Sequence, residues 1–266
     1  MAVVSINEGI VASWGSAGAG YPLGTPQVQS ATVTQAAEDL NYAETTAGRR
    51  TSLLSMQSWT GTISGLLPTP EDGYVGSITY SNGYVANLQS FGVTFTRPAF
   101  DTTVLGSGSR FRTFTHGNYE ASGTYTCWVD DGSSNPLVLA GASAPGGSDD
   151  DATISLSSGD TIELDVYTNN LAYRGEINGL PVATYSFFMS GTPTIAGSNN
   201  IIDTAGLSVG AETINIVTSS NSTDDSNVTG SAFWTSVSTT VTPGTATPVE
   251  IAFQGTGALT VDPAGT

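Results

Sequence analysis

The chain has a single histidine, so any serine-type catalytic arrangement would have to be built on that residue. A nucleophilic Ser needs a neighbouring His to take its proton, and the His needs a third group to orient it. We expect His116 to be a polar residue at the end of a loop, just before a strand. We expect no Gly-x-Ser-x-Gly nucleophile turn to work with it. The sequence therefore predicts no catalytic residue and no enzyme.

Three acidic clusters are the candidates for a metal site: Asp130-Asp131, Asp149-Asp150-Asp151 and Asp224-Asp225. None has the spacing of a calcium-binding loop, so we expect solvated turn acids. The run Gly106-Ser107-Gly108-Ser109-Arg110 lacks the Lys of a phosphate-binding loop and is expected to be flexible. The single cysteine, Cys127, excludes an intrachain disulfide and is expected to be a buried, inert thiol. We expect no metal and no cofactor.

The cationic side chains are few enough to be informative, because the chain has six Arg and no Lys. Arg49 and Arg50 fall in one predicted loop, and Arg110 and Arg112 fall at matching places in a second loop. Arg pairs with carboxylates through two parallel hydrogen bonds, which suits subunit interfaces. We expect these four residues to contact neighbouring subunits. The alternative is an exposed loop charge with little energetic effect.

Acidic residues dominate the charge of the chain. The 266 residues include 23 Asp and Glu, which give a formal net charge of −17. Direct binding to nucleic acid phosphates is therefore excluded as the main function. An acidic surface without Lys suits high salt, where self-repulsion is screened, so we expect a salt-loving host. The first residues lack a basic region with an apolar run, and no stretch of about 20 apolar residues occurs, so we expect neither secretion nor a membrane partner.

Alternation of apolar and polar residues predicts an all-β fold with few short helices. Clusters of Gly, Pro, Asn and Asp separate the alternating runs, as turns separate half-buried strands. The helix candidates are residues 35–44 and a short turn at 136–142. The predicted strands include 32–34, 92–96, 123–128, 161–167, 184–190, 212–218 and 249–254.

A front pattern and a back pattern each occur twice, and such internal similarity is a sign of repeated structure. The front matches are Gln29-Ser30 with Gln89-Ser90, Val33-Thr34 with Val93-Thr94, Gly61-Thr62 with Gly123-Thr124 and, more weakly, residues 9–12 with 83–86. The back match aligns residues 187–192 with 251–256, so that Phe187 corresponds to Ile251.

If each domain needs one front and one back, the contiguous pairing is residues 73–197. Residues 1–72 and 198–266 would then form a second domain around it, so that one copy is inserted within the other. The alternative is chance similarity among strands rich in Ser, Thr and Gly.

Two stretches of the chain carry a family resemblance. They are Phe111-Arg112-Thr113-Phe114-Thr115-His116-Gly117 with the following Tyr119 to Trp128, and the ending Phe253-Gln254-Gly255-Thr256-Gly257-Ala258-Leu259-Thr260. Both stretches resemble the tail tube proteins of long-tailed, siphovirus-like viruses. The resemblance implies β-sandwich or barrel-like domains that close into rings, which stack into a hollow tube guiding the genome from capsid to host. Typical members have one such domain and form six-membered rings. This chain is expected to depart from them by carrying two tube-like domains, in tandem or nested.

The function expected is therefore that of a structural virion protein, assembled in the host cytoplasm and located in the virion tail. Its partners would be copies of itself, other tail proteins and passing DNA, which a negatively charged lumen would repel and not bind. Three chains per ring are expected, with six as the alternative. The rival functions are a capsid decoration or host-recognition module and, less favoured, a β-sandwich hydrolase with carboxylates that converge across strands.

Overall fold

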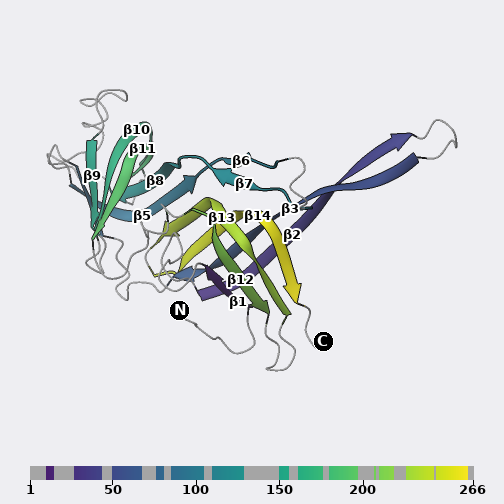
Figure 1. Cartoon of the computed structure of the whole chain (residues 1–266). Helices are drawn as coiled ribbons and strands as arrows, with labels where there is room; N and C mark the ends of the chain where they lie inside the picture. The colour runs from purple at the N-terminus through teal and green to yellow at the C-terminus, as the bar shows by residue number, and fades with distance from the viewer. Residues whose placement is uncertain are drawn as a thin grey trace.

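The computed structural model of the chain describes residues 10–14, 27–43, 50–67, 76–80, 85–104, 110–128, 150–155, 161–175, 180–196, 207, 210–218, 226–242 and 244–262. Every element whose bounds it gives is a β-strand in antiparallel pairing (Figure 1). The strands are β1 (Ile10–Trp14), β2 (Gln27–Ala43), β3 (Arg50–Leu67), β4 (Ser77–Tyr80), β5 (Val85–Thr96), β6 (Ala99–Asp101), β7 (Phe114–His116), β8 (Glu120–Trp128), β9 (Asp150–Ser155), β10 (Thr161–Arg174), β11 (Val182–Ala196), β12 (Glu212–Thr218), β13 (Ser226–Val241) and β14 (Thr247–Asp262). Each strand predicted above lies inside one of them, so the all-β fold class is confirmed.

The helix expected over residues 35–44 is wrong, because residues 35–43 belong to β2. The run contains helix formers such as Ala and Leu, but β2 pairs with β3 as far as Ala43, which faces Arg50. The partner strand provides hydrogen bonds for the backbone, and tertiary context overrides local propensity. Figure 1 shows the resulting β2–β3 hairpin extending well beyond the other strands. The second helix candidate, residues 136–142, lies outside the described residues.

Six strands between residues 77 and 196 pair in a closed circuit, which we call the closed group. β4 pairs with β5, β5 with β8, β8 with β11, β11 with β10, β10 with β9, and β9 with β4. The interior is aromatic: Tyr125 stacks on Tyr185 with ring centroids 4.7 Å apart, and Phe91 stacks on Phe187 at 6.2 Å. Closure of this kind pairs strand edges that would otherwise be open.

Six further strands form the terminal group, in the order β1-β12-β13-β14-β3-β2. Its core centres on Trp59, which is 2% exposed and meets the edge of Phe253 with ring centroids 6.1 Å apart. The Trp59 Nε1–H donates to the carbonyl of Gly257 at 3.0 Å. The ends of the row, β1 and β2, contact each other.

The two groups repeat each other strand for strand. The strands correspond one to one in pairing order: the terminal group runs β1-β12-β13-β14-β3-β2, and the closed group runs β4-β9-β10-β11-β8-β5. The weak sequence match of residues 9–12 with 83–86 is therefore wrong, because β1 takes the place of β4 and residues 85–86 belong to β5.

The pairing registers repeat as well. Val33 faces Gly61 in the terminal group, and Val93 faces Gly123 in the closed group. Neither glycine has room for a methyl group, since it would overlap a backbone carbonyl of the facing strand and an aromatic ring. The front match of the sequence therefore marks a place where two strands approach closely in both groups.

Bulges occur at matching positions. β2 carries an extra residue at Gln29 and β5 carries one at Gln89, while β10 and β13 carry extra residues at Asn169 and Thr235. A bulge bends its strand and increases the local twist. Matching bulges therefore bend the strands of the two groups in the same places.

The back match of the sequence has the wrong register. Phe187 faces Gly123, and Phe253 faces Gly61, so these two phenylalanines hold equivalent positions. The same alignment brings together two glycines that follow, Gly191 in β11 and Gly257 in β14, which both have a φ of 75°. The predicted match of residues 187–192 with 251–256 is therefore wrong, because the equivalent of Phe187 is Phe253 and not the residue at 251.

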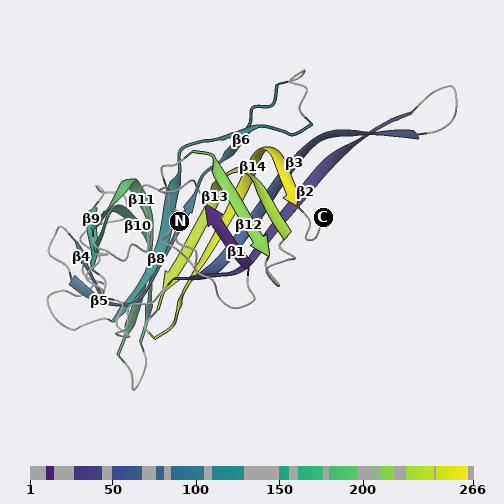
Figure 2. The ribbon, with the colours of Figure 1, turned by 60° about the horizontal axis from the view of Figure 1, so that its bottom comes forward.

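One strand pair joins the two groups. In β13, residues Ser236 to Val241 pair antiparallel with Thr96 to Phe91 of β5. The result is a row of eight strands, β10-β11-β8-β5-β13-β14-β3-β2, and Figure 2 shows β13, β14, β3 and β2 lying in this order. The sheet is thus connected throughout, and the division into a 73–197 domain and a domain of residues 1–72 and 198–266 stays a prediction.

Candidate functional site

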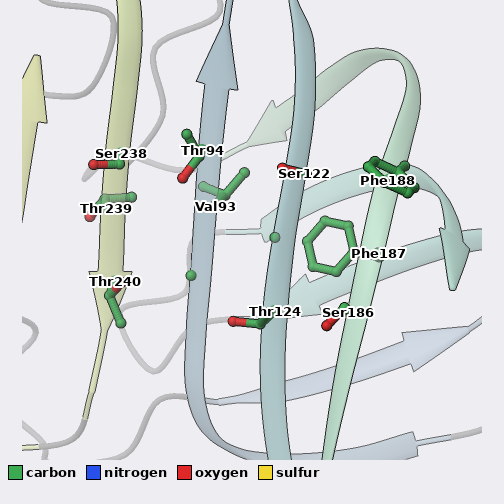
Figure 3. Close-up of a pocket in the computed structure, with 12 residues that line it drawn as sticks. Val93, Thr94, Ser122, Thr124, Ser186, Phe187, Phe188, Ser238, Thr239 and Thr240 are labelled. Carbon is green, nitrogen blue, oxygen red and sulfur yellow. The ribbon is translucent and has the colours of Figure 1, made fainter. Parts of the chain in front are cut away.

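An open trough crosses four neighbouring strands of the row, β13, β5, β8 and β11 (Figure 3). Its volume is about 410 Å³. Most of its lining residues are glycines or bear hydroxyls, and two are phenylalanines: Gly92, Val93, Thr94, Ser122, Gly123, Thr124, Ser186, Phe187, Phe188, Ser238, Thr239 and Thr240. None of these residues is ionisable at neutral pH, so the trough itself provides no acid, base or charged ligand.

The hydroxyls stand opposite one another across the strands because the pairing is in register. Thr94 lies between Ser238 on one side and Ser122 on the other. Along the next pair, Thr124 faces Ser186. Hydroxyls both donate and accept, so the surface offers many weak, neutral hydrogen bonds and no geometry for one particular ligand.

The carboxylates of this face flank the trough. Glu120 faces Thr96, and Glu250 lies between Ser238 and Ser64; both glutamates are exposed. They alternate along their strands with side chains that point into the core, as the two-residue period of a strand requires. Glu120 and Glu250 give this part of the face a negative charge.

Arg97 binds the junction between the two groups. Its backbone N–H donates to the carbonyl of the bulged Thr235 at 2.9 Å, and its side-chain Nε–H donates to the carbonyl of Trp234 at 2.6 Å. The guanidinium carbon lies 4.0 Å from the centre of the Trp234 ring, and the residue is 4% exposed. Burial lowers the pKa of Arg97 to about 10, so the side chain stays charged at neutral pH. The sequence analysis missed this residue, although it is the Arg that directly follows a predicted strand.

His116 was expected to be a loop residue just before a strand. This expectation is wrong, because His116 is the last residue of β7. Its ring meets Phe233 edge-on with centroids 5.6 Å apart, and its Nδ1 lies 3.1 Å from the carbonyl of Gly117. Among the described residues, the polar partner of Nδ1 is thus a carbonyl and not the carboxylate that orients a catalytic His.

One Gly-x-Ser-x-Gly pattern does occur, at residues 206–210, and the sequence analysis overlooked it. A methyl group at Gly210 would lie 3.6 Å from Nε2 of His116, so the pattern ends beside the only histidine. Ser208 lies outside the described residues, and the element with given bounds that follows the pattern is a strand, β12, not the helix of a nucleophile turn.

The described residues contain no group of three or more His, Cys, Asp or Glu side chains placed to hold a metal ion. Of the acidic clusters, Asp150 and Asp151 begin β9, whereas 130–131 and 224–225 lie outside the described part of the chain. Cys127 is buried, as predicted. No helix in the described part of the chain is long and apolar enough to cross a membrane.

Of the four loop Arg residues, Arg112 has an acidic partner in its own chain. Its Nη1 lies 3.0 Å from Oδ2 of Asp101. Hydrogen bonds from Thr103 hold the pKa of the Asp101 carboxyl below its usual value, and the charge of Arg112 adds to the effect. The pair is partly exposed.

The structure also places two of the other three loop Arg residues. Arg110 is exposed, and its carbonyl accepts a hydrogen bond from the N–H of Gln57 at 2.7 Å. Arg50 begins β3, and Arg49 lies outside the described residues. The structure thus brings Arg110 and Arg112 beside the middle of β3 and places Arg50 at its start.

The strands and the trough define an all-β protein with one hydroxyl-lined sheet face. No family model matches the chain, and no curated protein sequence matches it. Among solved structures, the chain is similar to a chain in the tail of an empty gene transfer agent particle, refined with C6 helical symmetry, and to one in the virion of a native gene transfer agent particle. Each likeness has 14% identity and a TM-score of 0.38 and covers 49% of this chain and 100% of the other. At this TM-score the likeness carries no weight for function.

Proposed function

We propose that the chain is a structural subunit of a viral tail tube, in which copies close into rings that stack around a channel. The observation that supports this best is the repeat of pairings, registers and bulges between the two groups. Each group contributes four strands to the row of eight, so one chain supplies two equivalent four-stranded segments, β10-β11-β8-β5 and β13-β14-β3-β2. The resemblance of 111–128 and 253–260 to tail tube proteins is a second support. The role is structural and not enzymatic, in the virion tail, after assembly in the host cytoplasm.

The repeat is best explained by duplication of one domain, with the 73–197 copy inserted into the other. Strands of similar composition share alternation by chance, but alternation alone does not specify a register. Here Gln29 and Gln89 are extra residues at the same step of the ladder, and so are Asn169 and Thr235. Bulges are retained features of related folds, so two matching pairs of them favour common ancestry over chance.

The face with the trough is the one we propose for the channel. Its opposite side packs on the apolar core, through side chains such as Phe95 and Tyr185. Hydroxyls and the exposed carboxylates Glu120 and Glu250 would give a channel wall that repels DNA phosphates and does not hold them. DNA would therefore pass without specific binding.

Closure of the ring determines how many chains it needs. Each chain supplies two four-stranded segments, and the β13–β5 junction already joins them within the chain. Three chains would supply six segments, the number that one-domain relatives of the resembled family place around the axis. Covalent linkage of segments raises their effective concentration and favours closure.

Electron microscopy of the purified protein tests the proposal. Rings or tubes with a central channel are expected. Discrete small particles at all protein and salt concentrations would overturn the proposal and favour the capsid decoration or host-recognition module. Near-neutral pH and raised salt are the conditions of choice, because screening reduces repulsion between chains of net charge −17.

The loop arginines give a variant test of assembly. We expect replacement of Arg49, Arg50, Arg110 and Arg112 by Ala, one at a time, to reduce the tube fraction in sedimentation while leaving the melting temperature near that of the parent. Each pairing lost between subunits removes a charge-assisted hydrogen bond. The effect should be smallest for Arg112, because Asp101 of its own chain already binds it. Unchanged sedimentation of all four variants would reject the interface role.

A further inference from the structure

We infer that β10 of one chain pairs antiparallel with β2 of a second copy, in a register that the junction inside each chain predicts. The inference rests on the proposed function and names the contact that would close the ring. It concerns residues 170–174 of β10 with Gly175 directly after it, and residues 31–36 of β2.

Both strand segments have an open side among the described strands. β10 pairs with β9 only over Thr161 to Val166, so its second half has β11 as its one strand partner. β2 pairs with β3 and with no other described strand. Side chains of β2 are half-buried or exposed from Gln27 to Ala37. Open edges present unpaired N–H and C=O groups and invite a strand from another chain.

The intrachain junction shows which strands meet. β13 of the terminal group is equivalent to β10 of the closed group. Likewise, β2 of the terminal group is equivalent to β5 of the closed group. β13 uses the half that extends past β12, and β5 uses the half that extends past β4. The free half of β10 and residues 31–36 of β2 are the equivalents of these two halves. The partner that fits is therefore a second copy of this chain.

The register follows from the equivalent positions. The extra residues of the matching bulges align β13 with β10 and β5 with β2, position by position. Ser238 faces Thr94 in the junction. In this alignment the equivalent of Ser238 is Ala172, and the equivalent of Thr94 is Thr34. Both pairs lie on the trough face, so we expect Ala172 of one chain to face Thr34 of the next.

The next pair explains an exposed aromatic side chain. Thr239 faces Val93, and both are buried in the junction. Their equivalents are Tyr173, which is 51% exposed, and the half-buried Val33. Pairing with a second copy would lay Tyr173 against Val33 and remove apolar surface from water.

The intrachain junction has a clamp that the junction between chains lacks. Arg97 binds the intrachain junction through Trp234 and Thr235, and its equivalent at the end of the β2 segment is Ala37. The contact between chains lacks this clamp, so it should be weaker and dissociate more readily than the one within a chain.

Cysteine pairs test the register. We expect a chain with Ala172→Cys and Thr34→Cys to form covalent dimers and trimers on mild oxidation of the assembled protein, read on a non-reducing gel. The matched control is Ser238→Cys with Thr94→Cys, which has the same strand geometry and should close within one chain. The register control is Ala172→Cys with Thr32→Cys, displaced along the strand to the next position on the same face, where the Cα atoms lie too far apart for a disulfide. Cys127 is fully buried and should not react.

The outcomes separate the register from the proposed function. Crosslinks in the Ala172/Thr34 chain but not in the Ala172/Thr32 chain support the inference. Rings in the microscope with no Ala172/Thr34 crosslink, while the Ser238/Thr94 control closes, overturn the inference and leave the tube proposal standing. Chains that never associate overturn both. If the double variant does not fold, mixing an Ala172→Cys chain with a Thr34→Cys chain asks the same question, and heterodimers are the supporting result.

Discussion

Replacing Trp59 by Ala should lower the free energy of unfolding by about 3 to 5 kcal/mol, because a large buried aromatic leaves a cavity that the sheet cannot close. The indole is 2% exposed, contacts Phe253 and donates to the carbonyl of Gly257. Urea denaturation followed by far-ultraviolet circular dichroism gives the change. The same measurement should show Gly255→Ala losing about 1 to 3 kcal/mol, because the added methyl would overlap the indole of Trp59.

The double variant Trp59→Ala/Gly255→Ala tests the contact between these two residues directly. With the indole gone, the methyl of Gly255→Ala has space, so the combined loss should be well below the sum of the two single losses. Gly175→Ala is the control, since its new methyl would meet only ordinary contacts with Tyr173. Additive losses would contradict the packing of Trp59 on Gly255.

Arg97→Ala should cost about 2 to 4 kcal/mol of unfolding free energy, because it removes a charged hydrogen bond to the Trp234 carbonyl and a desolvated contact with the Trp234 ring. Arg97→Lys should lose less, because it keeps the charge over the ring while losing the Nε–H donor. Thermal unfolding of both variants beside the parent provides the comparison.

Arg112→Ala is the matched control, since its partner lies at the surface and exposed ion pairs contribute little. A melting temperature of Arg97→Ala equal to that of the parent would mean that this residue does not hold the two groups together.

Much of the fold was predictable because strand alternation is a local signal. The strand at 92–96, for example, reads directly from Gly-Val-Thr-Phe-Thr, and its Val93 and Phe95 are buried. Residues 35–43 were not predictable in this way, since their own propensities favour a helix and only pairing with the neighbouring strand β3 makes them a strand.

The repeat was visible in the sequence with the right register for the front match, but the register of the back match was not predictable. A slip by one full period of the strand keeps every side chain on its face, so alternation cannot tell whether Phe187 corresponds to Ile251 or to Phe253. The distinction comes from the glycines that Phe187 and Phe253 face across the ladder, which are equivalent. Arg97 was missed for a similar reason: its partners lie far away in sequence and meet it only when β13 pairs with β5.

The symmetry of assembled rings tests the central claim most directly. Averaged electron micrographs of tubes or rings, viewed along the axis, should show true threefold symmetry with six similar lobes, because each chain supplies two equivalent segments. The power spectrum would then contain a strong pseudo-sixfold component and a weaker threefold one. Rings with six whole chains and true sixfold symmetry would contradict the account, since one of the two groups would then lie outside the wall.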